Sequence, residues 1–572
     1  MMSAGRRTSS PSGGSLVRRV SPPAGAGPAT DSELARLTRA FLALGVTIRL
    51  VRLLLVHPLW GDECFVAANL IDRGYLDLLR PLDYQQVAPI LFLWAERTAV
   101  AWFGFSEWSL RVFPTACAIG SLFLFRHAAG RVMGGWPLLF AVAILSVATT
   151  PIRHSGEAKP YASDFLVALV LLALAIEWWR RPERSRWLWV LAIATPPCLG
   201  LSLPAVFVAG GTGLALAGPV LKSRRRGVVA AWLASGVALA ASFAAVWKIH
   251  EGADSAEVQA YMDHYWSAFF PPTGDPLALV GWLIRAHLGF LFAYPVGGAR
   301  GASVLTAACV VVGAAHLRRR GGATIVAACL APLGLALAAS AIRRYPYGDN
   351  ERIMQFAGPM ACLLAGLGLA VALGRLGRRR PGADRRVGRA VLGAFAAIGV
   401  GTIVADLIQP AKSAVDLRSR EFARWFWAEA GRDGELACAR VDLGLDFEGG
   451  PSHHGRSADY LTYQAIYSER RRHRRPLDWR ATSHAHPLRC VLYDGVPLDS
   501  PLFGRWMAAM GPHYRLARVT TCGVNSGSET KGVPVADHLA ILEFTPRGEP
   551  VDPARLAALA VSAGADRPRE GE

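Results

Sequence analysis

The sequence has few charged residues and no paired cysteine motif. Charged side chains make up 18% of the 572 residues, below the roughly 25% that is usual in soluble domains. The nine cysteines are scattered without a C-x-x-C pair, and no His/Cys cluster has the spacing of a zinc site. Neither a CxxC redox motif nor a structural zinc site is therefore predicted.

Lysine is also scarce, because arginine carries almost all of the positive charge behind the formal net charge of +19. In a soluble protein such a charge would suggest a nucleic-acid partner. Here the arginines cluster between apolar blocks, which is typical of cytoplasmic anchors, so no nucleic-acid partner is predicted. The preference for arginine indicates a high-GC bacterial genome, and therefore a bacterial inner membrane with the periplasm outside it.

Apolar residues are abundant: hydrophobic residues make up 52% of the chain, and the mean hydropathy is +0.28. They fall in blocks of about 16–22 residues, close to the roughly 20 that one membrane-spanning helix needs. The predicted fold is an all-α polytopic membrane bundle followed by a C-terminal α/β soluble domain. Its predicted spans are 38–58, 109–128, 136–151, 162–180, 187–201, 203–221, 228–248, 302–317, 322–341, 353–374 and 389–408.

Arginine positions predict how these eleven spans are oriented. The basic segments, which are the N-terminal tail, 126–131, 180–186, 222–226, 318–320 and 375–386, all fall on one side, which the positive-inside rule makes the cytoplasm. Residues 1–35 are then a disordered cytoplasmic tail without an evident signal peptide, and the membrane domain is 36–408. Two apolar stretches, 89–104 and 277–295, are predicted to lie along the outer interface. The alternative is that both are spans, giving thirteen.

The C-terminal region has ordinary soluble patterning. Residues 409–551 are predicted to be a periplasmic α/β domain, and 552–572 a flexible tail. Strands are predicted at 436–443, 489–493, 514–522 and 538–544, and helices at 457–472 and 502–510. Acceptor recognition, or capping of the membrane site, is the role expected for this domain.

Two adjacent carboxylates, Asp62 and Glu63, follow the first predicted span. Acidic groups at a membrane boundary are costly unless they are solvated, paired or used. The functional interpretation is a general base facing a substrate at the bilayer surface, with a metal ligand as another possibility. The structural alternative is that Asp62 is the N-cap of a helix covering 63–73.

A second outward segment, 150–164, contains Arg153, Glu157, Lys159, Tyr161 and Asp164. A cation beside the helix that begins there could clamp a phosphate. The alternative is an ordinary polar loop with a snorkelling lysine.

A third outward segment, 343–352, contains Arg344, Tyr347 and Arg352. Arginines on the outer side depart from the positive-inside trend, and binding of an anionic lipid or phosphate would explain them. The alternative is an arginine–acid pair that holds helices together.

These segments, in this order, resemble the GT-C glycosyltransferases, in particular the protein O-mannosyltransferase and aminoarabinose-transferase-like group. The resemblance covers roughly 38–408. The strings that carry it are Gly-Asp-Glu at 61–63, 88–94 with 103–114, 157–164, and 344–348 with Arg352.

The resemblance implies transfer of a sugar from a polyprenyl-phosphate donor to a lipid, glycan or protein acceptor at the outer face. Asp62 would deprotonate the acceptor hydroxyl, and a single displacement would invert the anomeric configuration. Lys159, Arg344, Arg352 and, less strongly, Arg153 are candidates to stabilise the leaving phosphate. The scheme requires no metal, and a divalent cation is the alternative cofactor.

The sequence departs from the family pattern at Gln86. Many relatives have a Lys-Pro-Pro triplet there, with the lysine near the carrier phosphate, whereas this chain has Gln86-Val-Ala-Pro. This departure makes Lys159 the lysine of greatest interest.

Two other functions remain open. A transporter or flippase of lipid-linked sugars would show paired repeats and broken helices at the midplane, and no clear repeat is present. A non-catalytic scaffold would leave the carboxylate pair and the 150–164 segment unexplained.

Overall fold

The protein is described here from a computed structural model that covers the helical bundle and parts of the C-terminal region. The described residues are 31–250, 263–298, 303–348, 350–409, 411–412, 414–429, 436–438, 462–467, 486–492, 504, 507–508, 510–525 and 536–547. The predicted tail 552–572, nearly all of the tail 1–35, and most of the helices predicted at 457–472 and 502–510 lie outside these residues.

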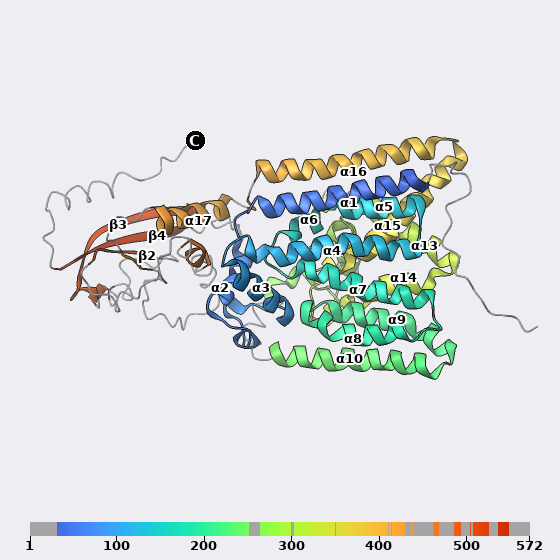
Figure 1. The fold of residues 1–572 in the computed structure, drawn as a ribbon, viewed down its shortest axis with the longest axis horizontal. Helices are drawn as coiled ribbons and strands as arrows, with labels where there is room; N and C mark the ends of the chain where they lie inside the picture. The colour runs from blue at the N-terminus through green and yellow to red at the C-terminus, as the bar shows by residue number, and fades with distance from the viewer. Residues whose placement is uncertain are drawn as a thin grey trace, which may run out of the picture.

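Long helices lie side by side in a bundle, and the β-strands lie beyond one end of it (Figure 1). The bundle helices are α1 (Asp31–Leu54), α4 (Ser109–Val132), α5 (Gly135–Ser146), α6 (Thr149–Ser155), α7 (Tyr161–Arg180), α8 (Arg186–Leu201), α9 (Ala205–Ser223), α10 (Arg226–His250), α13 (Ser303–Leu317), α14 (Ala323–Ala341), α15 (Gly358–Arg379) and α16 (Ala383–Ile408). Short helical segments are η1 (Asp77–Leu79), η2 (Asp83–Gln85), η4 (Ser267–Phe269), η5 (His287–Leu291), η6 (Arg318–Gly322), η7 (Gln355–Ala357) and η8 (Trp425–Glu429).

Each of the eleven predicted spans corresponds to helix in the structure. By length and apolar composition, seven helices among the described residues could cross a membrane, or eight if the bent pair α5 and α6 is one span. The stretch Ser303–Ala341 counts once in that number, although non-helical backbone at Arg320 and Gly321 divides it into α13 and α14. The chain is therefore a multi-pass membrane protein, and the full count of eleven spans stays a prediction.

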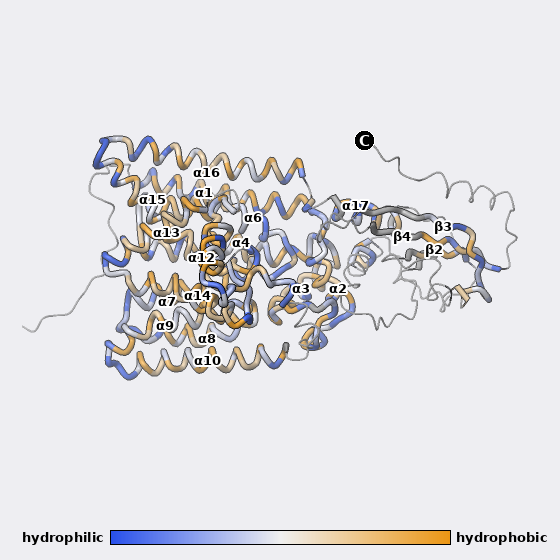
Figure 2. The backbone as a smooth tube through the Cα atoms, turned by 180° about the vertical axis from the view of Figure 1, so that it is seen from behind, coloured by the Kyte–Doolittle hydropathy of each residue, from blue (hydrophilic) through white to orange (hydrophobic). Residues whose placement is uncertain are grey.

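The two ends of the bundle differ. Hydrophilic segments lie at both ends, with hydrophobic backbone between them (Figure 2). We call one end the arginine-rich end, because the loops that follow α4, α7, α9, α13 and α15 gather there. Two contacts lie at this end: Arg131 Nε near the end of α4 is 2.5 Å from Glu177 Oε1 near the end of α7, and Arg225 donates to the Glu183 carbonyl over 3.3 Å. The other end, next to the β-strands, is called the sheet-side end.

Glycines allow a close contact between helices α13 and α15. A Cβ atom at Gly368 would lie 1.8 Å from the Cys309 carbonyl oxygen, and one at Gly313 would lie 2.0 Å from the Leu364 carbonyl oxygen. Small residues let helix backbones approach in this way, which contributes packing energy inside a membrane. This contact fixes α15, whose first residue follows the loop that contains Arg352.

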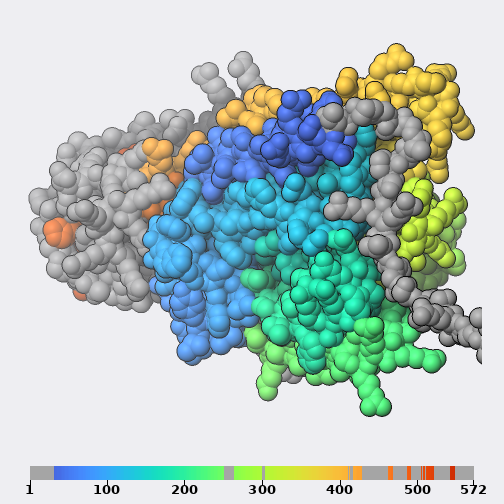
Figure 3. All heavy atoms as spheres, turned by 45° about the vertical axis from the view of Figure 1, so that its right-hand side comes forward, coloured from blue at the N-terminus to red at the C-terminus, as the bar shows by residue number. Residues whose placement is uncertain are grey.

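Helices α2 (Gly61–Asp72) and α3 (Ile90–Phe103) lie across the sheet-side end of the bundle. In the space-filling view this segment is the blue surface between the bundle and the orange residues of α17 (Ala414–Arg424) (Figure 3). The predicted interfacial stretch 89–104 thus forms one short helix outside the bundle. The second stretch, 277–295, forms α12 (Pro276–Ala286) and η5.

The C-terminal strands form one four-stranded sheet in the order β1-β2-β4-β3. The strands are β1 (Leu436–Cys438), β2 (Leu488–Leu492), β3 (Tyr514–Asn525) and β4 (Ala536–Pro546). β1 pairs with β2 in parallel, and the other two pairings are antiparallel. All four strands occur where the sequence predicts them, because each is a short run of apolar and β-branched residues between polar segments.

Candidate functional site

The segment that leads into α2 places the carboxylate pair at the sheet-side end. Trp60 is the N-cap of α2, and the backbone N–H of Trp60 donates to Glu63 Oε2 over 3.1 Å. The structural interpretation of Asp62 as the N-cap is therefore wrong, since Asp62 lies within the first turn. Glu63 makes the side-chain hydrogen bond at the helix start, and the Asp62 side chain bonds instead to Arg352.

Glu63 is buried and fully engaged. Arg111 on α4 donates to both of its oxygens over 2.9–3.2 Å, and the side chains of Glu63 and Arg111 are only 1% and 3% exposed. The backbone N–H of Ala158 also donates to Glu63 Oε1 over 2.8 Å. Glu63 therefore ties α2 to the residue that immediately precedes Lys159.

Asp62 is the more accessible carboxylate, with a side chain that is 30% exposed. Arg352 Nη1 donates to Asp62 Oδ2 over 2.6 Å. Oδ1 makes no hydrogen bond to any residue that the structure describes. One oxygen of Asp62 is thus held in place while the other remains available to a substrate.

Lys159 lies in the short connection between α6 and α7 and is 8% exposed. Its ammonium donates to the Gln86 side-chain carbonyl over 2.8 Å. Burial lowers the pKa of Lys159 below its ordinary value, and Asp62 partly opposes this shift. A neutral amide partner leaves the positive charge of this ammonium without a carboxylate in direct contact.

A second charged group surrounds Glu157. His154 Nδ1 lies 2.8 Å from Glu157 Oε2, and Arg153 lies 3.8 Å from Glu157 and 3.5 Å from Glu351. Burial alone would raise the pKa of Glu157, but His154, Lys412 and Arg153 outweigh it and lower the pKa to about 2. Glu157 is therefore ionised at neutral pH and acts as a hydrogen-bonding partner for the side chains around it, rather than as a proton acceptor.

Tyr161 and Asp164 lie in the first turn of α7. The Tyr161 ring packs 4.9 Å from the His154 ring, and Tyr161 interacts electrostatically with Asp62, Arg352 and Asp164. Asp164 is 5% exposed.

Two predicted site residues make no hydrogen bond or ion pair with Asp62 within the part of the chain that the structure describes. The Arg344 side chain is exposed, while Tyr347 is buried and its hydroxyl lies 3.0 Å from His287 Nε2. The structure thus gathers Asp62, Glu63, Arg153, Glu157, Lys159, Tyr161, Asp164 and Arg352 at one end of the bundle.

Several residues at the site carried no sufficient sequence signal. Arg111 is a single charge whose partner Glu63 lies far away in the sequence, so only the fold reveals the pairing. Glu351 is noticeable as a charge at a predicted span end, but its partner Arg153 is not predictable. Trp60 is another: its ring lies 5.2 Å from the Arg352 guanidinium carbon. Lys412 could have been noticed because lysine is so scarce in this chain.

The C-terminal region contacts the segment before α2 directly. The Tyr463 hydroxyl accepts a hydrogen bond from the Leu59 N–H over 2.9 Å and donates to the Leu59 carbonyl over 3.1 Å. Arg420 on α17 donates to the Val56 carbonyl over 2.7 Å. The C-terminal region therefore holds the backbone three residues before Asp62.

No metal site is evident among the described residues, where no group of three or more His, Cys, Asp or Glu side chains could hold an ion. Neither a family model nor a curated protein sequence matches the chain.

Solved structures that are similar over most of the chain include ArnT from Cupriavidus metallidurans in the apo state, with 14% identity and a TM-score of 0.46 over 89% of this chain and 98% of that one. The same protein bound to undecaprenyl phosphate has 12% identity and a TM-score of 0.48 over 88% and 97% of the two chains. The archaeal oligosaccharyltransferase AglB from Archaeoglobus fulgidus, in complex with an inhibitory peptide and a dolichol-phosphate, has 11% identity and a TM-score of 0.42 over 77% and 61%. These are GT-C proteins, the group that the sequence resembles. At these identities and TM-scores, nothing about the activity, substrates or site residues of this chain follows from the likeness.

Proposed function

We propose that this chain is a membrane glycosyltransferase. It transfers a sugar from a polyprenyl-phosphate donor to an acceptor hydroxyl at the sheet-side end of the bundle, which faces the periplasm. The observation that carries the proposal is the convergence of Asp62, with one available oxygen, and Lys159, with an ammonium not bound to a carboxylate. Arg352 interacts with both residues: it donates a hydrogen bond to Asp62, and its charge acts on the Lys159 ammonium.

Each group has a role in a single displacement. Asp62 Oδ1 accepts the proton of the acceptor hydroxyl, whose oxygen attacks the anomeric carbon. The bond from that carbon to the phosphate oxygen breaks, and its electron pair stays on the phosphate. Lys159 stabilises the negative charge that develops there, and the configuration inverts.

Lys159 also accounts for the departure at Gln86. The family resemblance expects a phosphate-binding lysine at that position, and here Lys159 Nζ bonds to the Gln86 side chain itself over 2.8 Å. A lysine ammonium therefore lies beside position 86, where the family has its lysine, although this lysine comes from the loop between α6 and α7.

Glu63 acts as a positioning residue in this scheme. Its contact with the Ala158 N–H couples the helix of the base to the loop of the phosphate-binding lysine. Because Arg111 donates to both of its oxygens, Glu63 has no oxygen free to face a substrate, whereas Asp62 has Oδ1.

The proposal is tested by reconstituting the protein in liposomes that contain undecaprenyl-phosphate sugars. Release of undecaprenyl phosphate together with a glycosylated acceptor is expected from the wild type. Movement of intact donor between leaflets without its cleavage would contradict the transferase and favour a flippase. Neither activity, across a panel of hexose and pentose donors and lipid, glycan and peptide acceptors, would favour a scaffold.

A further inference from the structure

A second lysine reaches the site from the segment that follows the bundle. Lysine occurs in this chain only at positions 159, 222, 248, 412 and 531. Lys159 and Lys412 both interact electrostatically with Asp62, Arg352 and Glu157. In a chain that uses arginine for nearly every other cation, these two ammonium groups share one set of neighbours.

Lys412 lies over Trp60, the residue that starts the helix of Asp62. Its Nζ lies 2.8 Å from the centroid of the Trp60 ring, and the Arg352 guanidinium carbon lies 5.2 Å from the same centroid. An aromatic face does not compensate a cation as a carboxylate does, so the positive charge can still attract an anion. Lys412 makes no ion pair with any carboxylate that the structure describes.

The segment that carries Lys412 is held from both sides. At the end of α16, Asp406 forms an ion pair with Arg52 of α1. Beyond Lys412, Arg420 of α17 bonds to the Val56 carbonyl. These contacts hold the chain before and after Lys412, whose exposed side chain lies over the Trp60 ring.

Each carboxylate of this group contacts an arginine of the protein. Arg352 pairs with Asp62, Arg111 pairs with Glu63, and Arg153 lies within 4 Å of both Glu157 and Glu351. Lys159 and Lys412 are the two ammonium groups left over among these charged residues. A donor phosphodiester carries one negative charge, but the released carrier is a phosphomonoester, which carries a second one when its last proton is lost.

We propose that Lys412 is a phosphate-binding residue that stabilises the second negative charge of the released polyprenyl phosphate. This inference rests on the proposed function. In the transfer step, the electron pair of the broken carbon–oxygen bond stays on the phosphate while the acceptor proton moves to Asp62. Lys159 binds the charge already present in the donor, and Lys412 binds the charge that appears as the bond breaks.

The test is a binding measurement in nanodiscs with three probes: undecaprenyl phosphate, its methyl ester and undecaprenol. The methyl ester retains one charge, as the donor does. Lys412→Ala is expected to weaken the binding of undecaprenyl phosphate about tenfold, which corresponds to roughly 1.4 kcal/mol, since it removes one charge-assisted contact. It should weaken the methyl ester by less than about threefold, and Lys412→Arg should stay near the wild type for both.

The matched control is Lys222→Ala, an exposed lysine at the arginine-rich end, which should leave all three affinities unchanged. If the wild type binds undecaprenyl phosphate no better than undecaprenol, the proposed function fails. If it discriminates between them but Lys412→Ala binds like the wild type, only the inference about Lys412 fails. Equal weakening of the phosphate and its methyl ester would also overturn it, and a melting temperature equal to the wild type's confirms that the variant is folded.

Discussion

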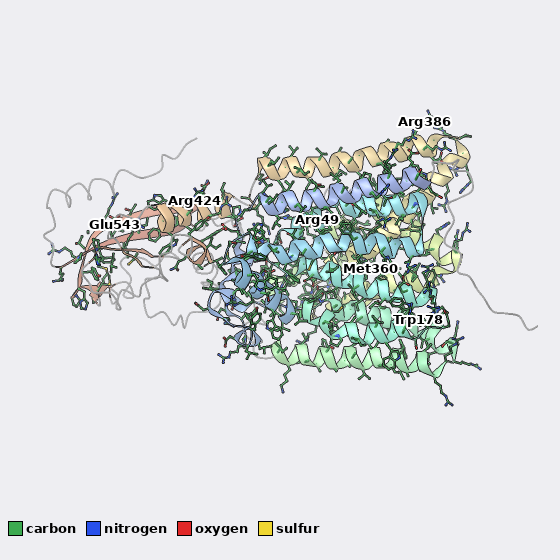
Figure 4. All side chains as sticks on the ribbon, viewed as in Figure 1. Arg49, Trp178, Met360, Arg386, Arg424 and Glu543 are labelled. Atoms are coloured by element: carbon green, nitrogen blue, oxygen red, sulfur yellow. The ribbon has the colours of Figure 1, made fainter. Side chains whose placement is uncertain are left out.

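The same residue type is used in opposite ways at the two ends of the bundle. At the arginine-rich end the side chains of residues 318–320, 378–380 and 385–386 are exposed, and Arg389 is 71% exposed beside Glu33. At the sheet-side end Arg111 is 3% exposed and bonded to Glu63. The labelled Arg386 marks the first end, opposite to Arg424 in α17 (Figure 4).

This difference indicates two roles for arginine: membrane anchoring at one end and positioning of the site residues at the other. Exposed arginines with solvated charge fit a role at a membrane surface, where each contributes modestly and independently. Buried arginines must be bonded on several sides, so they fix the relative positions of the segments that they join. At the sheet-side end, buried charged side chains therefore hold the surrounding segments in position.

The largest expected effect concerns sidedness. In intact bacterial cells, a membrane-impermeant maleimide should label Arg344→Cys but leave Arg386→Cys unlabelled until the cells are permeabilised. Arg344 is the better outer position, because Gly348 has φ +89° and a Cβ there would lie 2.4 Å from Ala286 Cβ. Labelling of Arg386→Cys from outside, after subtraction of wild-type labelling, would overturn the predicted orientation.

The next effect concerns stability. Arg111→Met leaves the Glu63 carboxylate buried without its cation, and we expect a loss of about 3–5 kcal/mol in the free energy of unfolding. Arg386→Met removes an exposed arginine and should change it by less than about 0.5 kcal/mol. Equilibrium unfolding in mixed micelles measures both, and equal losses would mean that the two ends do not differ as described.

A smaller effect is expected at the contact with the C-terminal region. Tyr463→Phe leaves the Leu59 N–H and carbonyl without their partner, at a cost of about 1–3 kcal/mol. Amide hydrogen exchange should accelerate over residues 56–60. Tyr75→Phe is the matched control, because Tyr75 is 42% exposed and its hydroxyl bonds to the Thr98 side chain rather than to the 56–60 segment. Unchanged exchange at 56–60 would show that Tyr463 does not hold this segment.

Sequence patterns predicted helix positions well, because each apolar block is long and bounded by arginines. They also singled out Asp62, Lys159 and Arg352, since charges at predicted span ends are unusual. They could not show that Arg111 bonds to both oxygens of Glu63, because that pairing joins residues 48 positions apart. Nor could they predict that Lys412 lies over the Trp60 ring, since this contact depends on the path of the chain after α16.

The central claim is that Asp62 is the base of a sugar transfer, and turnover of an undecaprenyl-phosphate sugar tests it most directly. Asp62→Asn keeps the size of the side chain but removes its basicity, so we expect turnover to fall roughly 10²–10⁴-fold with folding intact. Asp77→Asn changes a carboxylate that is 50% exposed at the same end and should retain wild-type turnover. Full turnover by Asp62→Asn would contradict the account.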